Sequence, residues 1–207
     1  MTFTAIDTKA FFSEELAAVT QQQGPVFDYV AGMLAARVTT TDSQVFSEEA
    51  ISVMVSNLWG LERSAAPLLR AFDGRREGET RVRWVYEQFR GLGDELLFLC
   101  GLFPEAVDNA YKRRLVGLKF YMEQGPLCYD GAHNVLERHP WAGADDPGTL
   151  NQLAGQFPDW TESLFRLRER FKTLPEDARI LQSIYEATRS PTARRLLQQE
   201  RRLHLVN

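Results

Sequence analysis

The stretch 80–103 constrains the fold more than any other part of the chain. Its apolar residues recur at alternating steps of three and four, which places them on one face of an α-helix. These residues are Val82, Val85, Phe89, Leu92, Leu96, Leu99 and Phe103. From residue 96 onward the opposite face is apolar as well, with Leu97, Phe98 and Gly101. A helix that is apolar all round is buried, so residues 96–103 are predicted to form the hydrophobic centre of the fold.

Charged residues occupy the opposite face of the first half of this helix. Arg83, Glu87, Arg90 and Asp94 alternate in sign at helical spacing, and such pairs support a helix. Asp94 stands where the helix passes into apolar surroundings, and a buried carboxylate needs a partner. Arg90 lies one turn earlier and is the expected partner.

The rest of the chain also reads as helices. Leu and Ala together number 45, whereas Val and Ile number 17, and that balance favours helices over strands. The pattern predicts helices at 7–23, 25–38, 47–62, 65–73, 80–103, 105–124, 126–138, 147–157, 159–173, 175–189 and 191–203. The stretch 142–148 is the one plausible linker, but the helices beside it are too short for a core of their own. We therefore expect one all-α domain over residues 1–207, a single compact multi-helix bundle.

Charge and hydropathy exclude several classes of protein. With 24 basic and 28 acidic residues, the net charge of −4 leaves no basic excess to hold nucleic acid. The longest apolar run, residues 96–103, is far shorter than the ~20 residues that span a bilayer. The first residues carry no secretory signal, and Cys100 and Cys128 are too far apart for a CxxC metal clip. We expect a cytoplasmic protein without a membrane span, in which both cysteines are buried as small hydrophobes.

The segment Phe89–Glu105 (FRGLGDELLFLCGLFPE) resembles a group of uncharacterised bacterial helical proteins. In that group a Leu-Gly-Asp segment precedes a Leu-Phe…Gly…Phe run, and a Tyr-rich helix follows. Residues 120–125 and Tyr129 are similar to that helix here. Pro126 departs from the pattern and predicts an interruption of the helix at that point. The resemblance implies an all-helical fold and supplies no activity.

Three tyrosines suggest a ligand pocket between helices. Tyr111, Tyr121 and Tyr129 lie on either side of Gly125, and the last two share nearly one face if the helix continues. Together with Arg90 and Asp94, and with His133 nearby, they form a candidate polar-aromatic pocket. In the alternative interpretation each tyrosine is a core ring whose hydroxyl reaches the surface.

Asp130, His133 and Glu137 form the candidate metal site. Spacings of three and four place them on one face of a helix, and Asp-x-x-His resembles half of a carboxylate–histidine site in a bundle. A two-metal site needs a second such pair, which His139 and His204 do not provide. The alternative is a solvated polar face beside a histidine. No cofactor is expected, and a metal ion is the one candidate.

The carboxyl-terminal third is basic and offers a candidate partner-binding surface. Residues 161–207 hold ten Arg or Lys against six acids, whereas residues 1–60 hold two against seven. The last helix brings together Arg194, Arg195, Arg201 and Arg202. Such an end can dock on an acidic partner, a membrane surface or nucleic acid. The simpler interpretation pairs it with the acidic amino-terminal part of the same chain or of a second copy.

Two classes of function remain open. The chain has no G-x-S-x-G elbow, no Walker loop and no H-E-x-x-H motif, which favours a non-catalytic interaction or regulatory module that self-associates as a homodimer or binds another protein. The alternative is a metal-dependent or small-ligand-binding enzyme with its site around Asp94, Tyr121, Tyr129 and His133.

Overall fold

Within each described range of the chain, short connections join successive helices. The computed structural model describes residues 5–40, 78–111 and 117–170, together with 182, 185, 186, 189–195, 197 and 198. The elements in these residues are α1 (Ala5–Ala17), α2 (Pro25–Thr40), α4 (Glu79–Leu102), α5 (Pro104–Tyr111), α6 (Leu118–Arg138), the 3-10 helix η1 (Pro140–Ala142), α7 (Pro147–Gly155) and α8 (Phe157–Arg170). Every one is a helix, so the predicted all-α bundle is confirmed. The predicted helices 47–62 and 65–73 lie outside the described residues, as does most of 175–189 and 191–203.

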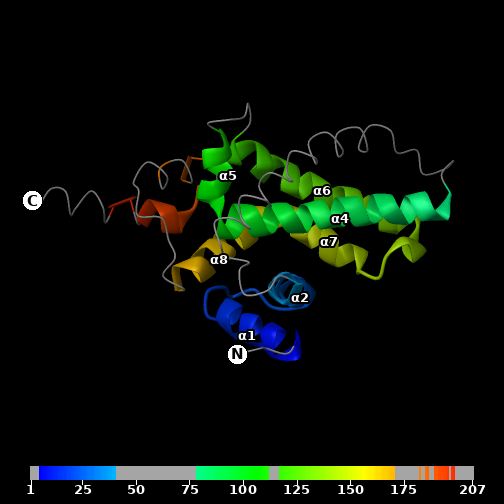
Figure 1. The fold of residues 1–207 in the computed structure, drawn as a ribbon, viewed down its shortest axis with the longest axis horizontal. Coiled ribbons are helices and arrows are strands. Elements are labelled where there is room, and N and C mark those ends of the chain that lie inside the picture. Colours follow the sequence, from blue (N-terminus) through cyan, green and yellow to red (C-terminus); the bar gives the residue numbers. More distant parts are fainter. Residues whose placement is uncertain are drawn as a thin grey trace, which may run out of the picture.

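α4 lies at the centre of the bundle, as its apolar pattern predicts. It packs against α5, α6, α8 and η1, and Figure 1 shows α6 running alongside it. All residues from 96 to 103 are buried, so the predicted hydrophobic centre is confirmed. No helix in the described part of the chain is long and apolar enough to cross a membrane.

Glycines set how closely the neighbouring helices approach α4. A Cβ added to Gly93 would come within 2.8 Å of the Tyr129 ring on α6, and one added to Gly101 would come within 2.6 Å of Leu164 on α8. These two helices therefore reach the α4 backbone itself. Gly91, two residues before Gly93, is exposed and has open space around it. Only Gly93 of that pair is a packing site.

α6 continues without a break through Pro126, so the predicted interruption at that residue is wrong. Proline removes one helical hydrogen bond and also crowds the residue before it. That preceding residue is Gly125, which has no Cβ to clash. The same glycine admits the Phe157 ring of α8, whose Cζ would lie 2.1 Å from an added Cβ. The continuous helix puts Tyr121 and Tyr129 nearly on one face.

The stretch 142–148 is packed onto the bundle rather than serving as a linker. A Cβ added to Gly143 would lie 2.2 Å from the Tyr86 ring of α4. Asp146 caps α7, since its carboxylate accepts hydrogen bonds from the Thr149 amide (2.8 Å) and hydroxyl (3.0 Å). These two bonds lower the Asp146 pKa below its ordinary value.

Candidate functional site

Asp94 is buried and hydrogen-bonded to two tyrosines from other helices. The Tyr29 hydroxyl of α2 donates to its Oδ1 (2.7 Å), and the Tyr129 hydroxyl of α6 donates to the same oxygen (3.0 Å). Arg90 Nη2 lies 3.7 Å from Oδ2. The predicted pairing with Arg90 is confirmed, but the tyrosine hydroxyls are the closer partners.

Arg90 connects this buried carboxylate to a second one nearer the surface. Its Nε lies 2.7 Å from Asp145 Oδ2 and 3.1 Å from the Tyr29 hydroxyl oxygen, and its guanidinium carbon lies 5.6 Å from the centroid of the Tyr29 ring. Tyr86 donates its own hydroxyl to Asp145. We call these six residues the Asp94 network: Tyr29, Tyr86, Arg90, Asp94, Tyr129 and Asp145. The network joins α2, α4, α6 and the segment before α7.

Burial is the largest influence on the pKa values of Asp94, Tyr29 and Tyr129. It raises the pKa of Asp94, while the Arg90 charge and the hydrogen bonds from Tyr29 and Tyr129 act in the opposite direction. Burial and the Asp94 charge raise the pKa values of Tyr29 and Tyr129 well above the ordinary value. Both hydroxyls therefore stay protonated and donate. Donors and acceptors are matched inside the chain, which is the arrangement of a structural network.

Tyr121, a further member of the predicted tyrosine pocket, does not join this network. Tyr121 is buried two turns before Tyr129, which is about 12 Å along the helix axis, and its ring contacts Phe120 with centroids 5.4 Å apart. Tyr111 is the last residue of α5, and its side chain lies outside the described part. The structure thus brings Arg90, Asp94 and Tyr129 together, and it adds Tyr29, Tyr86 and Asp145. Tyr29 and Asp145 lie far from Asp94 in the sequence, and Tyr86, on α4 itself, joins the network through Asp145, so no local pattern pointed to them.

The candidate metal residues lie on the solvent side of α6. Asp130 and Glu137 are exposed, and His133 is half-buried with its Nδ1 3.0 Å from the Pro147 carbonyl oxygen. In the described ranges no group of three or more His, Cys, Asp or Glu is placed to hold a metal ion. His133 instead ties α6 to the start of α7, and the two carboxylates belong to a solvated face.

Both cysteines are free and buried, as expected. Burial raises the pKa of Cys128 to about 12 and raises that of Cys100 as well. Neither thiol is a nucleophile at neutral pH, because the thiolate is the reactive form.

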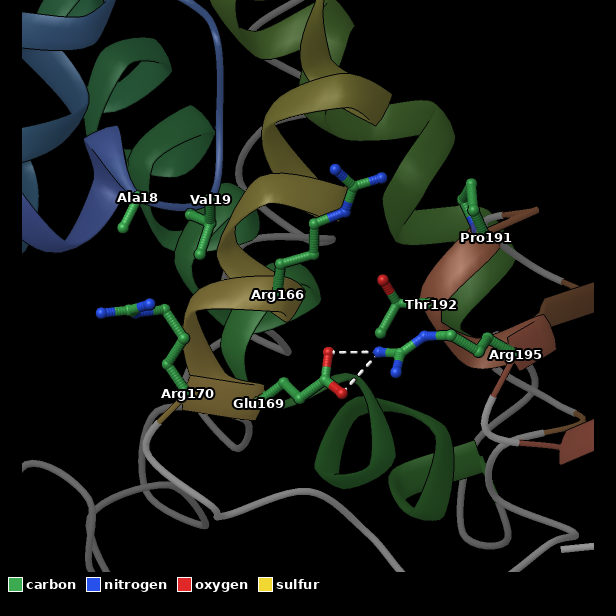
Figure 2. Close-up of a pocket in the computed structure, with 8 residues that line it drawn as sticks. All are labelled: Ala18, Val19, Arg166, Glu169, Arg170, Pro191, Thr192 and Arg195. Carbon is green, nitrogen blue, oxygen red and sulfur yellow. Dashed lines mark hydrogen bonds and ion pairs between the residues drawn. The ribbon is translucent and has the colours of Figure 1, made fainter. Parts of the chain in front are cut away.

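A groove that the sequence did not predict runs along α8. Two adjoining cavities of about 460 and 690 Å³ lie between α8, residues 17–22 at the end of α1, and residues 189–195. Ala18, Val19, Arg166 and Pro191 line both cavities, so they form one space, which we call the α8 groove. Figure 2 shows the residues that line the smaller cavity, with α8 between Val19 and Pro191.

Residues 189–195 form one wall of the α8 groove, and two carboxylates of α8 bind this segment. Glu162 Oε1 accepts hydrogen bonds from the Thr192 hydroxyl (2.6 Å) and the Thr192 amide (3.3 Å). Glu169 receives Arg195 Nη2 on both oxygens, at 2.6 Å from Oε2 (Figure 2). The predicted partner-binding residue Arg195 is therefore engaged within the chain. Arg194 beside it is exposed.

Among the described residues, an ion pair joins the acidic amino-terminal part of the chain to its basic third. Arg170 Nε of α8 lies 2.8 Å from Glu15 Oε2 of α1. The intramolecular pairing predicted for the basic third is observed at this point. Arg201 and Arg202, the other two predicted partner-binding residues, lie outside the described part.

Two buried acceptors in the wall of the α8 groove have no hydrogen-bond partner. They are Glu162 Oε2 and Gln22 Oε1, both shielded from water, and no donor among the described residues reaches them. Both residues line the larger cavity. Buried polar atoms in native proteins are nearly always paired, so these two are exceptions within the wall. A donor in the cavity does not reach them as they stand, because both oxygens are shielded from solvent.

No protein-family model, curated protein or solved structure matches this chain. The family resemblance of residues 89–105 therefore stays a prediction. The function must be inferred from the chain's own geometry.

Proposed function

We propose that the chain is a non-catalytic interaction module that holds a segment of a partner protein in the α8 groove. The observation that carries this proposal is the α8 groove itself, an open hollow lined by apolar and charged side chains of three segments. A peptide segment supplies both side chains and main-chain polar groups, which suits a groove of mixed lining.

The lining of the α8 groove also suits a protein segment. Ala18, Val19 and Pro191 give apolar contact, while arginine and glutamate side chains stand around them. An apolar centre inside a polar rim is the usual anatomy of a protein–protein interface. Cytoplasmic location and self-association as a homodimer are part of the same proposal, since a second copy of the chain is one possible partner.

The competing proposal, an enzyme with its site around Asp94, has less support. Tyr29, Tyr129 and Arg90 already surround the Asp94 carboxylate, so a substrate would have to displace them. His133 is engaged with Pro147, and Tyr121 is packed in the core. A small-ligand site at this place would need the network to open.

Affinity capture with blocked variants tests the proposal. Ala18→Trp places a bulky ring in the α8 groove, and Ala144→Trp places the same ring on an exposed residue before α7. We expect partner proteins to be retained by the wild type and by Ala144→Trp and to be lost from Ala18→Trp. Equal retention by all three baits would contradict the proposal. Stoichiometric iron, manganese or zinc in protein purified without a histidine tag would favour the enzyme instead.

A further inference from the structure

We propose that a segment near the end of one chain docks on α8 of a second copy, in exchange for that copy's own segment. The segment comprises residues 190–195 and Leu197, and we call it the strap. Within the chain the strap forms part of one wall of the α8 groove, so in the exchanged dimer each groove is completed by the partner copy. The inference names a second copy as the partner and does not depend on what the groove itself holds.

The contacts between the strap and α8 are specific side-chain pairs that a second copy also supplies. Glu162 Oε1 accepts hydrogen bonds from the Thr192 hydroxyl (2.6 Å) and amide (3.3 Å), and Glu169 Oε2 accepts one from Arg195 (2.6 Å). The two glutamates are seven residues apart, so they lie on one face of α8. α8 also packs against α4 and α6, so we expect it to keep this face when the strap leaves.

The strap has the features of a short helix that docks as a unit. Residues 191–195 are helical, and the Ser190 hydroxyl accepts a hydrogen bond from the Ala193 amide (3.0 Å), so the helix carries its own N-terminal cap. Ala193 and Leu197, four residues apart, are both buried, whereas Arg194 is exposed. One face of the helix is therefore apolar and another is polar, which is the pattern of a helix that binds to a protein surface.

Arg189 joins the strap to the preceding helical turn in a strained conformation. Its φ is 57°, in the left-handed region that residues with a Cβ rarely adopt. Its amide donates to the Tyr185 carbonyl oxygen (2.8 Å) and closes that turn. A change of the backbone at Arg189 moves the strap away from α8 and relieves the strain. Short connections under strain favour the exchange of a segment between copies.

A second copy supplies what the face of α8 needs once the strap has left it. The strap of the partner copy restores the donors of Thr192 to Glu162 and of Arg195 to Glu169, which Figure 2 shows facing α8. Exchange in both directions is symmetric and closes at two chains, so it gives a dimer and not a filament. The contacts are the same in both forms, so relief of the strain at Arg189 favours the dimer at high protein concentration.

Complementary charge variants of the full chain test the proposal. Glu169→Arg and Arg195→Glu each set like charges against one another, both within one chain and between two identical chains. In a mixture of the two variants, opposite charges meet only when each strap docks on the other chain. We expect light scattering to show monomers for each variant alone, and native mass spectrometry to show a dimer with one chain of each kind in the mixture. The double variant Glu169→Arg, Arg195→Glu is the matched control, because it restores the ion pair and should dimerise as the wild type does.

The connection at Arg189 gives a second test in chains that keep every contact between the strap and α8. Glycine adopts a φ of 57° without strain, whereas alanine keeps the Cβ, and both substitutions remove the same guanidinium. We expect the dissociation constant of the dimer to be about tenfold or more higher for Arg189→Gly than for Arg189→Ala.

Three results would contradict the proposal. They are a wild type that stays monomeric at every protein concentration, a mixture of Glu169→Arg and Arg195→Glu that stays monomeric although circular dichroism shows both variants folded, and equal dimerisation of Arg189→Gly and Arg189→Ala. If a charge variant does not fold, the comparison at Arg189 serves in its place. None of these measurements involves the occupant of the groove, so partner capture that depends on Ala18 would still support the proposed function.

Discussion

Tyr129 of α6 donates a hydrogen bond to Asp94 of α4 across the interface between the two helices, and both side chains are buried. The ring comes this close because Gly93, the neighbour of Asp94, has no side chain in its way. The contact thus depends on a neighbouring glycine and carboxylate of α4 and on a hydroxyl 35 positions after that carboxylate. It fixes the register of α6 on α4.

Removing the Tyr129 hydroxyl should destabilise the fold while the ring stays in place. We expect Tyr129→Phe to lower the free energy of unfolding by about 1–2 kcal/mol, the usual effect of losing a buried hydrogen bond to a charged group. Urea denaturation measures the change. Tyr185→Phe is the matched control, because the Tyr185 ring is only half-buried and lies beside Arg189. Equal stability of Tyr129→Phe and wild type would show that the bond contributes nothing.

Removing the Asp94 carboxylate should lower the free energy of unfolding by more than Tyr129→Phe does. A second substitution at Arg90 should not restore the lost stability. Asp94→Ala leaves two tyrosine hydroxyls without their acceptor, so we expect about 3 kcal/mol of destabilisation. Arg90 keeps Asp145 at 2.7 Å, so it is not left unpaired. Adding Arg90→Met therefore removes a second favourable contact. Chemical denaturation of the single and double variants measures their free energies of unfolding. Clear recovery of stability in the double variant would mean that Asp94 serves mainly to neutralise Arg90.

Stability should fall as the solution becomes strongly alkaline. The pKa values of Tyr29, Tyr86 and Tyr129 are raised in the folded chain, chiefly by burial, above the ordinary value of about 10. Above that pH the unfolded chain loses these protons while the folded chain keeps them. The folded state then binds more protons, so its stability decreases as pH rises, by about 1.4 kcal/mol per pH unit for each tyrosine. Below about pH 10 this contribution is fully present.

Urea denaturation at a series of pH values from neutral to strongly alkaline measures that slope. Tyr129→Phe should make it shallower, because one of the three titrating hydroxyls is gone. A slope that is the same in Tyr129→Phe and wild type would show that Tyr129 ionises as readily in the folded chain as in the unfolded one.

The apolar periodicity was enough to predict the fold, and it could not predict the partners of Asp94. The steps of three and four from Val82 to Phe103 report which face of a helix is buried, and that face is buried in the structure. Arg90 was found because it lies one turn away on the same helix. Tyr29 and Asp145 reach Asp94 and Arg90 only through the packing of other segments, and a single sequence carries no signal for such a contact.

The α8 groove escaped prediction for a similar reason. Its walls come from residues 17–22, from α8 and from residues 189–195, three segments far apart in the chain. The sequence did show that the last third is basic, and Arg195 was among the residues predicted to bind a partner. What it could not show is that Glu169 and Glu162 hold that segment against α8.

The two glycines Gly125 and Gly91 should respond to alanine in opposite ways, although both lie inside helices. A Cβ at Gly125 would meet the buried Phe157 ring at 2.1 Å, and the residue must also precede Pro126 in a helical conformation. The ring has to move within a packed core, so we expect Gly125→Ala to destabilise by about 1–3 kcal/mol. Gly91 has open space around it, so Gly91→Ala should stabilise α4 by up to about 1 kcal/mol through helix propensity alone. Thermal and urea denaturation of both variants show whether each substitution raises or lowers stability. Destabilisation by Gly91→Ala would show that another part of the chain packs on that face of α4, and a neutral Gly125→Ala would show that α8 can move away from α6 at no cost.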